Sequence, residues 1–147
     1  MRLRILLPLL LISTFLMSQD NKETLILGTW LNVKQTAHIR IEQVNNKIQG
    51  KIVWLKHPLD DKGQPLTDIN NPDKKKRQNP VLGLYVLKGF TYSGNGKWEG
   101  GTIYSPELGK VYDCEISISD PNKLEVRGFI GVSLVGRTDI WTRVKTH

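Results

Sequence analysis

The chain has 147 residues, of which 39% are hydrophobic and 24% are charged, and its 21 Lys and Arg against 14 Asp and Glu give a formal net charge of +7. This length supports a single domain. The composition excludes a disordered, collagen-like or multi-span membrane chain.

The N-terminal segment has the pattern of a secretory signal peptide. Arg2 and Arg4 precede the apolar run 5–17, and the small residue Ser18 leads into a polar sequence. This run is shorter than the roughly 20 apolar residues that a membrane span needs. We therefore predict a signal peptide over residues 1–18, a domain over residues 19–147, export to the periplasm or the extracellular space, and no stable membrane span after cleavage.

Cleavage also changes the charge balance. Removing residues 1–18 takes away two arginines and no acid, so the net charge falls from +7 to +5. This charge is too mild to indicate a nucleic-acid reader, and we expect no nucleic-acid partner. Cys114 is the single cysteine of the chain, so no disulfide forms within it and the hydrophobic core must stabilise the domain alone.

From residue 25 onward, short β-rich runs alternate with tight-turn compositions, and no stretch keeps the spacing of an amphipathic helix. Consecutive strands joined by such turns pair antiparallel. Because closure removes exposed sheet edges, the pattern favours an all-β, eight-stranded antiparallel up-and-down barrel. The predicted strands cover residues 25–33, 37–44, 47–55, 81–89, 97–104, 110–119, 123–130 and 133–144.

One connection, residues 56–80, is much longer than joining two strands requires. Long connections in compact domains are usually functional or mobile. We expect this one to act as a lid over one mouth of the barrel, and it contributes Asn71 and Asp73 to the expected ligand-binding residues. Its basic run either binds an anionic partner or is simply solvated. The run consists of Lys74, Lys75, Lys76 and Arg77.

Aromatic side chains on the predicted inner faces are candidates for lining a ligand cavity, which is typically apolar with a few placed polar groups. By the period of two in a strand, Trp54 shares a face with Ile52, and Trp98 shares a face with Tyr104. Glycines within the strands leave space inside the barrel. The alternative is ordinary core packing. The expected lining residues are Trp54, Trp98, Tyr104 and Tyr112.

Two arginines near the C-terminus have two interpretations. Arg127 and Arg137 lie on adjacent predicted strands, on the face opposite the glycines. On the outer surface they would pair with Glu125 or Asp139 across strands. Facing inward they would anchor a carboxylate, and Arg127 is a candidate ligand-binding residue on that interpretation.

The two ends of the predicted barrel resemble the calycin superfamily of lipocalins and fatty-acid-binding proteins. Gly28-Thr29-Trp30 opens the first strand, and Arg143 lies near the end of the last. In that superfamily a Gly-x-Trp on the first strand packs against an Arg from the closing strand. The resemblance implies a lipocalin-like barrel.

A second resemblance covers nearly all of residues 19–147. The sequence resembles the bacterial family called domain of unknown function 2147, whose members are exported and have a lipocalin-like barrel. The sequence departs from the family pattern in two places. Ser105 stands where the family usually has Asp before Pro106, and a Lys-rich stretch follows Asp73. The resemblance implies a fold and a compartment and says nothing of chemistry. The matching motifs are Gly28-Thr29-Trp30, Gly50-Lys51-Ile52-Val53-Trp54, Asn70-Asn71-Pro72-Asp73, Gly83-Leu84, Trp98-Glu99-Gly100-Gly101-Thr102-Ile103-Tyr104, Gly109-Lys110-Val111-Tyr112, Val126-Arg127-Gly128-Phe129-Ile130-Gly131, Gly136-Arg137-Thr138 and Trp141-Thr142-Arg143.

The residues that carry chemistry do not form a recognisable catalytic set. His38 falls on a polar strand face, His57 begins the long connection, and Cys114 falls on an apolar face as an inert core thiol. No nucleophile motif, metal-ligand spacing or phosphate-binding loop is present. We therefore expect no catalytic residues, no metal and no cofactor.

Three functional hypotheses remain open. The first is an exported, non-enzymatic barrel that binds a small hydrophobic or amphipathic ligand in its interior. The second is an envelope interaction protein that binds an anionic glycan, lipid or protein through the basic residues 74–77. The third is an enzyme that uses carboxylates of the long connection. The sequence leaves the ligand and the oligomeric state undetermined.

Overall fold

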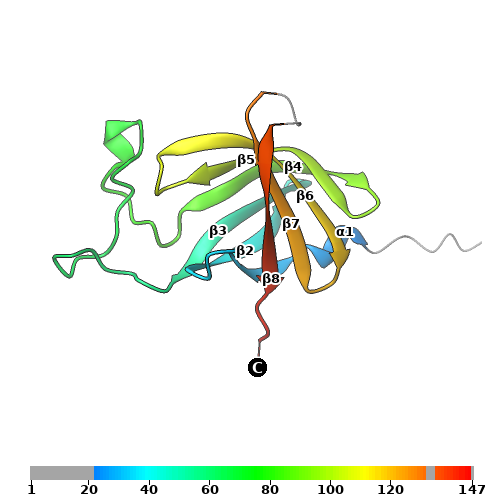
Figure 1. The fold of residues 1–147 in the computed structure, drawn as a ribbon, viewed down its shortest axis with the longest axis horizontal. Coiled ribbons are helices and arrows are strands. Elements are labelled where there is room, and N and C mark those ends of the chain that lie inside the picture. The colour runs from blue at the N-terminus through cyan, green and yellow to red at the C-terminus, as the bar shows by residue number, and fades with distance from the viewer. Residues whose placement is uncertain (1–21, 132–134, 147) are drawn as a thin grey trace, which may run out of the picture.

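The computed structural model describes residues 22–131 and 135–146. The predicted signal peptide lies outside the described residues. The elements in chain order (Figure 1) are α1 (Lys22–Leu25), β1 (Gly28–Leu31), β2 (Ala37–Val44), β3 (Lys47–Leu55), the 3-10 helix η1 (Lys74–Lys76), β4 (Tyr85–Gly94), β5 (Lys97–Ser105), β6 (Lys110–Asp120), β7 (Lys123–Phe129) and β8 (Gly136–Arg143).

The strands form one closed antiparallel barrel in which each strand pairs with its neighbours along the chain. β1 and β8 close the barrel, with Trp30 opposite Arg143 and Leu31 opposite Thr142. The predicted all-β, eight-stranded up-and-down barrel is confirmed. Closure pairs the first strand with the last and so removes the free edges of an open sheet, which is the usual advantage of this architecture.

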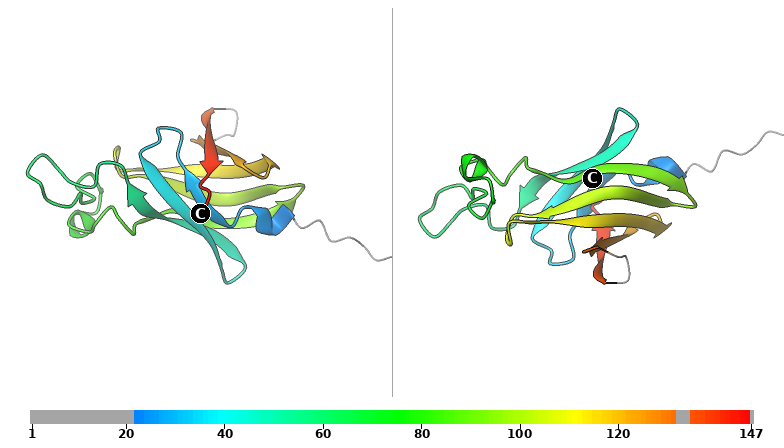
Figure 2. Two further views of the ribbon diagram at one scale, coloured as in Figure 1. Left: turned by 90° about the horizontal axis from the view of Figure 1, so that it is seen from below. Right: turned by 90° about the horizontal axis from the view of Figure 1, so that it is seen from above.

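Successive connections alternate between the two ends of the barrel. The connections that follow β1, β3, β5 and β7 lie at one end, which we call the mouth. The start of β1, the remaining turns and the end of β8 lie at the other end, which we call the closed end. Both views of Figure 2 place the long connection between β3 and β4 beyond the barrel, on the side away from α1.

Most strand bounds follow the sequence pattern. β2 and β3 have the predicted bounds, and β5, β6 and β7 each differ by one residue at the C-terminal end. β1 is shorter than predicted because Leu25 ends α1 and the N–H of Leu27 donates to the carbonyl of Thr24 (3.1 Å). β8 begins at Gly136, and residues 133 and 134 lie outside the described part of the chain.

The prediction of a strand over 81–89 is wrong in position. β4 starts four residues later, so the long connection covers residues 56–84. Gly83 has a φ of +89°, a value that glycine adopts without steric cost, and its N–H donates to the carbonyl of Ile52 (2.7 Å). This turn ends the connection, because the ladder between β3 and β4 begins beyond it.

A β-bulge in β3 exchanges the inner and outer faces near the end of the strand. The pair Ile39–Ile52 is followed by the pair His38–Trp54, so Val53 is an extra residue on β3. Trp54 therefore points outward, is 41% exposed, and lies with its ring centroid 4.3 Å from that of His38. The prediction that Trp54 faces inward is wrong, because one extra residue reverses the alternation.

A second bulge does the same in β5. The pairs Trp98–Ile116 and Gly101–Cys114 are separated by three residues on β5 and by two on β6. Trp98 is fully buried in the core, whereas Tyr104 belongs to the opposite face and lies beneath the long connection. The predicted shared face of Trp98 and Tyr104 is therefore wrong for the same physical reason.

The closed end is sealed by one arginine. The guanidinium carbon of Arg143 lies 4.2 Å from the ring centroid of Trp30, a cation–π geometry. The same guanidinium donates to the carbonyls of Leu27 (3.0 Å), Pro121 (2.8 Å) and Leu25. Burial lowers the pKa of Arg143, and these carbonyls replace the lost water.

Candidate functional site

The mouth half of the barrel contains a cavity of about 830 Å³. The difference between the halves lies in side-chain size. Large fully buried side chains fill the closed half, among them Trp30, Phe90 and Trp98. Smaller side chains line the cavity, including Ala37, Val81, Val86, Val126 and Gly128, so the walls cannot meet across the barrel.

The floor and walls of the cavity are apolar. Trp141 of β8 is buried and lies among the lining residues, so it is the described tryptophan whose fluorescence can report on the interior. Tyr112 of β6 lines the cavity, where its strand parity placed it. The aliphatic part of the wall includes Ile39, Ile52, Leu55 and Ile103.

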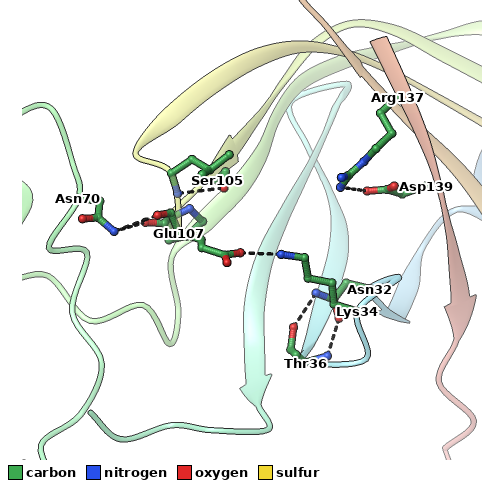
Figure 3. Close-up of polar contacts among 10 residues, drawn as sticks. Asn32, Lys34, Thr36, Asn70, Ser105, Glu107, Arg137 and Asp139 are labelled. Atoms are coloured by element: carbon green, nitrogen blue, oxygen red, sulfur yellow. Dashed lines mark hydrogen bonds and ion pairs between the residues drawn. The ribbon is translucent and has the colours of Figure 1, made fainter. Parts of the chain in front are cut away.

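Two ion pairs stand at the mouth (Figure 3). Lys34 Nζ lies 2.8 Å from Glu107 Oε2, which joins the β1–β2 connection to the β5–β6 turn. Arg137 Nη2 lies 2.9 Å from Asp139 Oδ2 within β8. The hydrogen bond from Arg137 to Asp139 raises the pKa of Arg137 further, so the guanidinium stays charged.

Arg137 lies on the inner face of β8 and not on the outer surface, where the first interpretation placed it. Arg137 and Asp139 alternate with the buried Trp141 along β8, and all three line the cavity. The inward alternative considered for this arginine is therefore the observed one. The side chain is nevertheless 75% exposed, because it lies near the open mouth.

The loops of the mouth are held by their own hydrogen bonds. Asn32 Oδ1 accepts from the N–H groups of Thr36 (2.8 Å) and Ala37 (3.0 Å), which shapes the β1–β2 connection. Asn70 Nδ2 donates to the carbonyl of Glu107 (3.0 Å), which ties the long connection to the β5–β6 turn (Figure 3). These bonds fix the outline of the mouth before any ligand binds.

The long connection is an ordered structure that forms one side of the mouth. Two isolated antiparallel bridges, Leu59–Pro65 and Thr67–Pro80, fold it back on itself. Five of its residues line the cavity, namely Leu66, Thr67, Ile69, Asn70 and Val81. Other parts of the connection project beyond the barrel (Figure 1). The idea that it acts as a lid stays a prediction.

A buried carboxylate anchors this connection. Asp68 is fully buried, its Oδ1 accepts from the hydroxyl of Tyr104 (2.7 Å) and its Oδ2 from Nδ2 of Asn71 (2.7 Å). Burial and this hydrogen bond raise the pKa of Tyr104 to about 12. Tyr104 reaches the edge of the cavity, but its hydroxyl donates to Asp68 and so holds the long connection instead of facing the cavity.

A second hollow of about 640 Å³, which we call the outer groove, lies outside the barrel between the long connection and the outer face of β4 and β5. Asn71 and Asp73 line it and do not line the cavity. Asn71 also holds Asp68, and Asp73 caps η1 by accepting from the N–H of Lys75 (3.0 Å). The structure therefore separates these two residues from the predicted aromatic lining.

The remaining predicted site residues lie elsewhere. Trp54 is on the outer surface and Trp98 is in the closed half of the core. Arg127 is on the outer face of β7, where its Nε lies 3.9 Å from Glu115 Oε1. The alternation along β7 puts Val126 inside and Arg127 outside, so Arg127 lies on the surface as in the first interpretation. Its ion-pair partner is Glu115 of β6, whereas that interpretation named Glu125 or Asp139.

The basic run forms η1 and its C-terminal cap. Lys74, Lys75 and Lys76 are exposed, whereas Arg77 is half-buried and its Nε donates to the carbonyl of Asn71 (2.7 Å). The run is thus three exposed lysines on a hydrogen-bonded turn.

Sequence reasoning missed the residues of the mouth. Lys34, Glu107 and several exposed apolar side chains line the entrance, yet all of them lie in turns or connections. Such segments have no period of two, so the pattern assigns them no face. Apolar residues within otherwise polar turns were the available signal, as at Val33 and Leu108.

In the part of the chain that the structure describes, no group of three or more His, Cys, Asp or Glu side chains is arranged to hold a metal ion. Within the same residues, no helix combines the length and the apolar character needed to cross a bilayer.

The chain is similar to known proteins in both sequence and fold. The family described as "Uncharacterized protein conserved in bacteria (DUF2147)" matches residues 28–143, which include all eight strands. The chain belongs to the DUF2147 family. This DUF2147 barrel is also similar to a solved structure, HP1028 from Helicobacter pylori, which is described as belonging to the lipocalin family. The two share 19% sequence identity over 81% of this chain and 82% of that chain, with a TM-score of 0.71. No curated protein matches the DUF2147 chain.

Proposed function

We propose that this protein binds a small amphipathic molecule in the barrel, with the apolar part in the cavity and the polar end at the mouth. One observation carries the proposal: the cavity of about 830 Å³ has a mainly apolar lining, and its charged lining residues, Lys34, Glu107, Arg137 and Asp139, form two ion pairs on the side of the mouth. Ligand pockets typically measure roughly 300–1,000 Å³ and combine apolar walls with a few polar groups. The likeness to a lipocalin structure supports the fold of such a binder.

The polar end of the ligand is the finer part of the proposal. Arg137 is highly exposed and remains charged, so it is accessible to an anionic group, and Lys34 stands at the same entrance. An arginine fork binds a carboxylate or phosphate through two parallel hydrogen bonds. We therefore propose an anionic headgroup, for which Arg137 exchanges or shares its contact with Asp139.

Binding rather than catalysis is favoured by the surroundings of the reactive side chains. Cys114 is buried, and burial raises the pKa of its thiol to about 12, so the thiol is a poor nucleophile. His38 packs against Trp54 on the outer surface, away from the cavity. The proposed compartment is the periplasm or the extracellular space, as the pattern of residues 1–18 suggests.

The first experiment fills the cavity. The probe is 11-(dansylamino)undecanoic acid, whose fluorescence rises in an apolar site. Val126 is buried and lines the cavity, so Val126→Phe places a ring in the empty space and is expected to weaken probe binding at least tenfold. Ile140→Phe adds the same ring on the outer face of β8 and serves as the control. Equal affinity of the two variants, or no binding by the unmodified protein, contradicts the proposal.

The second experiment tests the headgroup. Arg137→Gln removes the charge at the mouth and is expected to weaken binding of the dansylated acid about tenfold, while binding of its methyl ester stays unchanged. Asp139→Asn frees the guanidinium from its partner and is expected to strengthen binding of the acid. If Arg137→Gln affects acid and ester equally, the cavity binds apolar molecules without selecting an anionic end.

A further inference from the structure

The entrance of the cavity is surrounded by exposed apolar side chains. Their exposed fractions range from 46% to 69%. They come from four connections that are far apart in the sequence, and all of them line the mouth. We call this set the rim. The rim consists of Val33, Ile69, Leu108, Ile130 and Val135.

Exposed apolar side chains that gather in one place mark interaction surfaces, whereas isolated ones need no explanation. The rim is gathered, because its members surround one opening. The closed end contrasts with it, since its turns are built from polar residues such as Asn45, Asn95 and Asn122. One end of the barrel is therefore suited to contact an apolar partner and the other end to face water.

Cationic side chains lie at the same end. The exposed lysines Lys74, Lys75 and Lys76 belong to the long connection, which Figures 1 and 2 place beyond the mouth and away from α1. The 3-10 turn that presents them is capped by Asp73 and held by Arg77. Lysines beside an apolar surface complement the anionic headgroups above the acyl chains of a bilayer.

The charges also decide between possible occupants. A second copy of this chain docked mouth to mouth would bring two sets of these lysines together, and like charges repel. A bilayer that contains anionic lipid offers both an apolar layer for the rim and negative charge for the lysines. We infer that the rim and the η1 lysines form a docking surface for an anionic lipid bilayer, with the mouth of the barrel against the membrane.

Docking goes beyond the proposed function and does not require it. All eight strands, α1 and the long connection lie within residues 22–146, so the chain from residue 19 contains the whole barrel and omits the apolar run 5–17. This chain is tested by flotation with vesicles of phosphatidylglycerol and phosphatidylcholine in equal parts, and with vesicles of phosphatidylcholine alone. We expect binding to the mixed vesicles that weakens as salt is raised.

Three variants locate the contact. Replacing Ile69 and Leu108 together by Asn is expected to lower partitioning onto mixed vesicles at least tenfold. Replacing Lys74, Lys75 and Lys76 together by Gln is expected to lower it about 100-fold, since each lysine near an anionic surface contributes roughly fivefold. The matched control replaces Val44 and Ile140 by Asn, because both are exposed apolar residues that do not line the mouth. The control is expected to bind like the unmodified protein.

The outcomes separate docking from ligand binding. Val126→Phe is expected to keep vesicle binding while it loses the dansylated acid. If the unmodified protein binds the acid and no vesicle, the docking inference is overturned and the proposed ligand binding stands. The same holds if the control loses vesicle binding as much as the rim variant does. A dimer in sedimentation that the rim variant abolishes, without vesicle binding, assigns the rim to a second copy and also overturns it.

Discussion

The hydroxyl of Tyr104 donates a 2.7 Å hydrogen bond to Oδ1 of Asp68, a carboxylate that the protein buries completely. Tyr104 belongs to β5 and Asp68 to the long connection. A buried carboxylate is tolerated only where donors replace its lost water. The pair therefore holds the connection against the barrel and positions the part of it that lines the mouth.

Tyr104→Phe is expected to lower the free energy of unfolding by about 1–3 kcal/mol, because it leaves one oxygen of the buried Asp68 without this donor. Urea unfolding measures the loss, and limited proteolysis within residues 56–84 is expected to speed up. The control is Tyr85→Phe, since the Tyr85 hydroxyl makes no hydrogen bond within the described residues and its ring is retained. Equal effects of the two substitutions would show that the contact contributes nothing specific.

The same contact gives stability a dependence on high pH. Burial, followed by the hydrogen bond to Asp68, raises the pKa of Tyr104 from 10.0 to about 12. The folded state thus favours the neutral phenol, so this contribution is complete below pH 10 and is lost as the pH rises towards 12. In urea unfolding over this range, Tyr104→Phe is expected to lose less stability with pH than the unmodified protein does. Parallel curves would contradict the assignment.

The fold could be predicted from the sequence because its signals are local. Alternation within strands and compact turns between them give the number, order and direction of the strands. Register shifts are different, since the extra residue at Val53 is fixed by how β3 pairs with β2. Parity counting therefore places Trp54 on the wrong face, and it fails again beyond Trp98.

The site was harder to predict than the fold. Tyr112 lies in the cavity as expected, because the extra residue of the second bulge lies on β5 and leaves the alternation of Tyr112, Cys114 and Ile116 along β6 intact. The mouth depends on contacts between distant connections, such as Lys34 with Glu107. Nothing in either local sequence specifies that partner. Side chains in turns were for this reason absent from the expected lining.

Two neighbouring glycines test the bulge in β5. A Cβ at Gly101 would lie 2.5 Å from the ring of Phe90, which is fully buried and cannot move away. Gly101→Ala is expected to lower the free energy of unfolding by about 3 kcal/mol. Gly100 has a φ of +77° and open space around it, so Gly100→Ala is expected to cost about 1 kcal/mol. Thermal and urea unfolding compare the two, and the reverse order would contradict this description of the strand.

Cys114 should behave as an inert thiol. It is 1% exposed, and burial, with a smaller contribution from Glu115, raises its pKa to about 12. At pH 8 the thiolate is therefore scarcer by about 1,000-fold than for a thiol at the ordinary value of 9.0. We expect no reaction with a disulfide reagent in native buffer and rapid reaction of one thiol in urea. Fast labelling of the native protein, with unchanged circular dichroism, would disprove the buried placement.

Arg143 should be the charged residue of the closed end that matters most for stability. Its guanidinium lies over Trp30 and donates to the carbonyls of Leu27 and Pro121, so one side chain joins β1, β8 and the β6–β7 turn. Arg143→Ala is expected to lower the free energy of unfolding by about 3 kcal/mol. Arg143→Lys keeps the charge but cannot donate to these carbonyls at once, so about half of the loss remains. Arg40→Ala, on the exposed face of β2, is the control and is expected to stay within about 0.5 kcal/mol of the unmodified protein. If lysine restores full stability, charge alone accounts for the closed end, and the fork of hydrogen bonds does not.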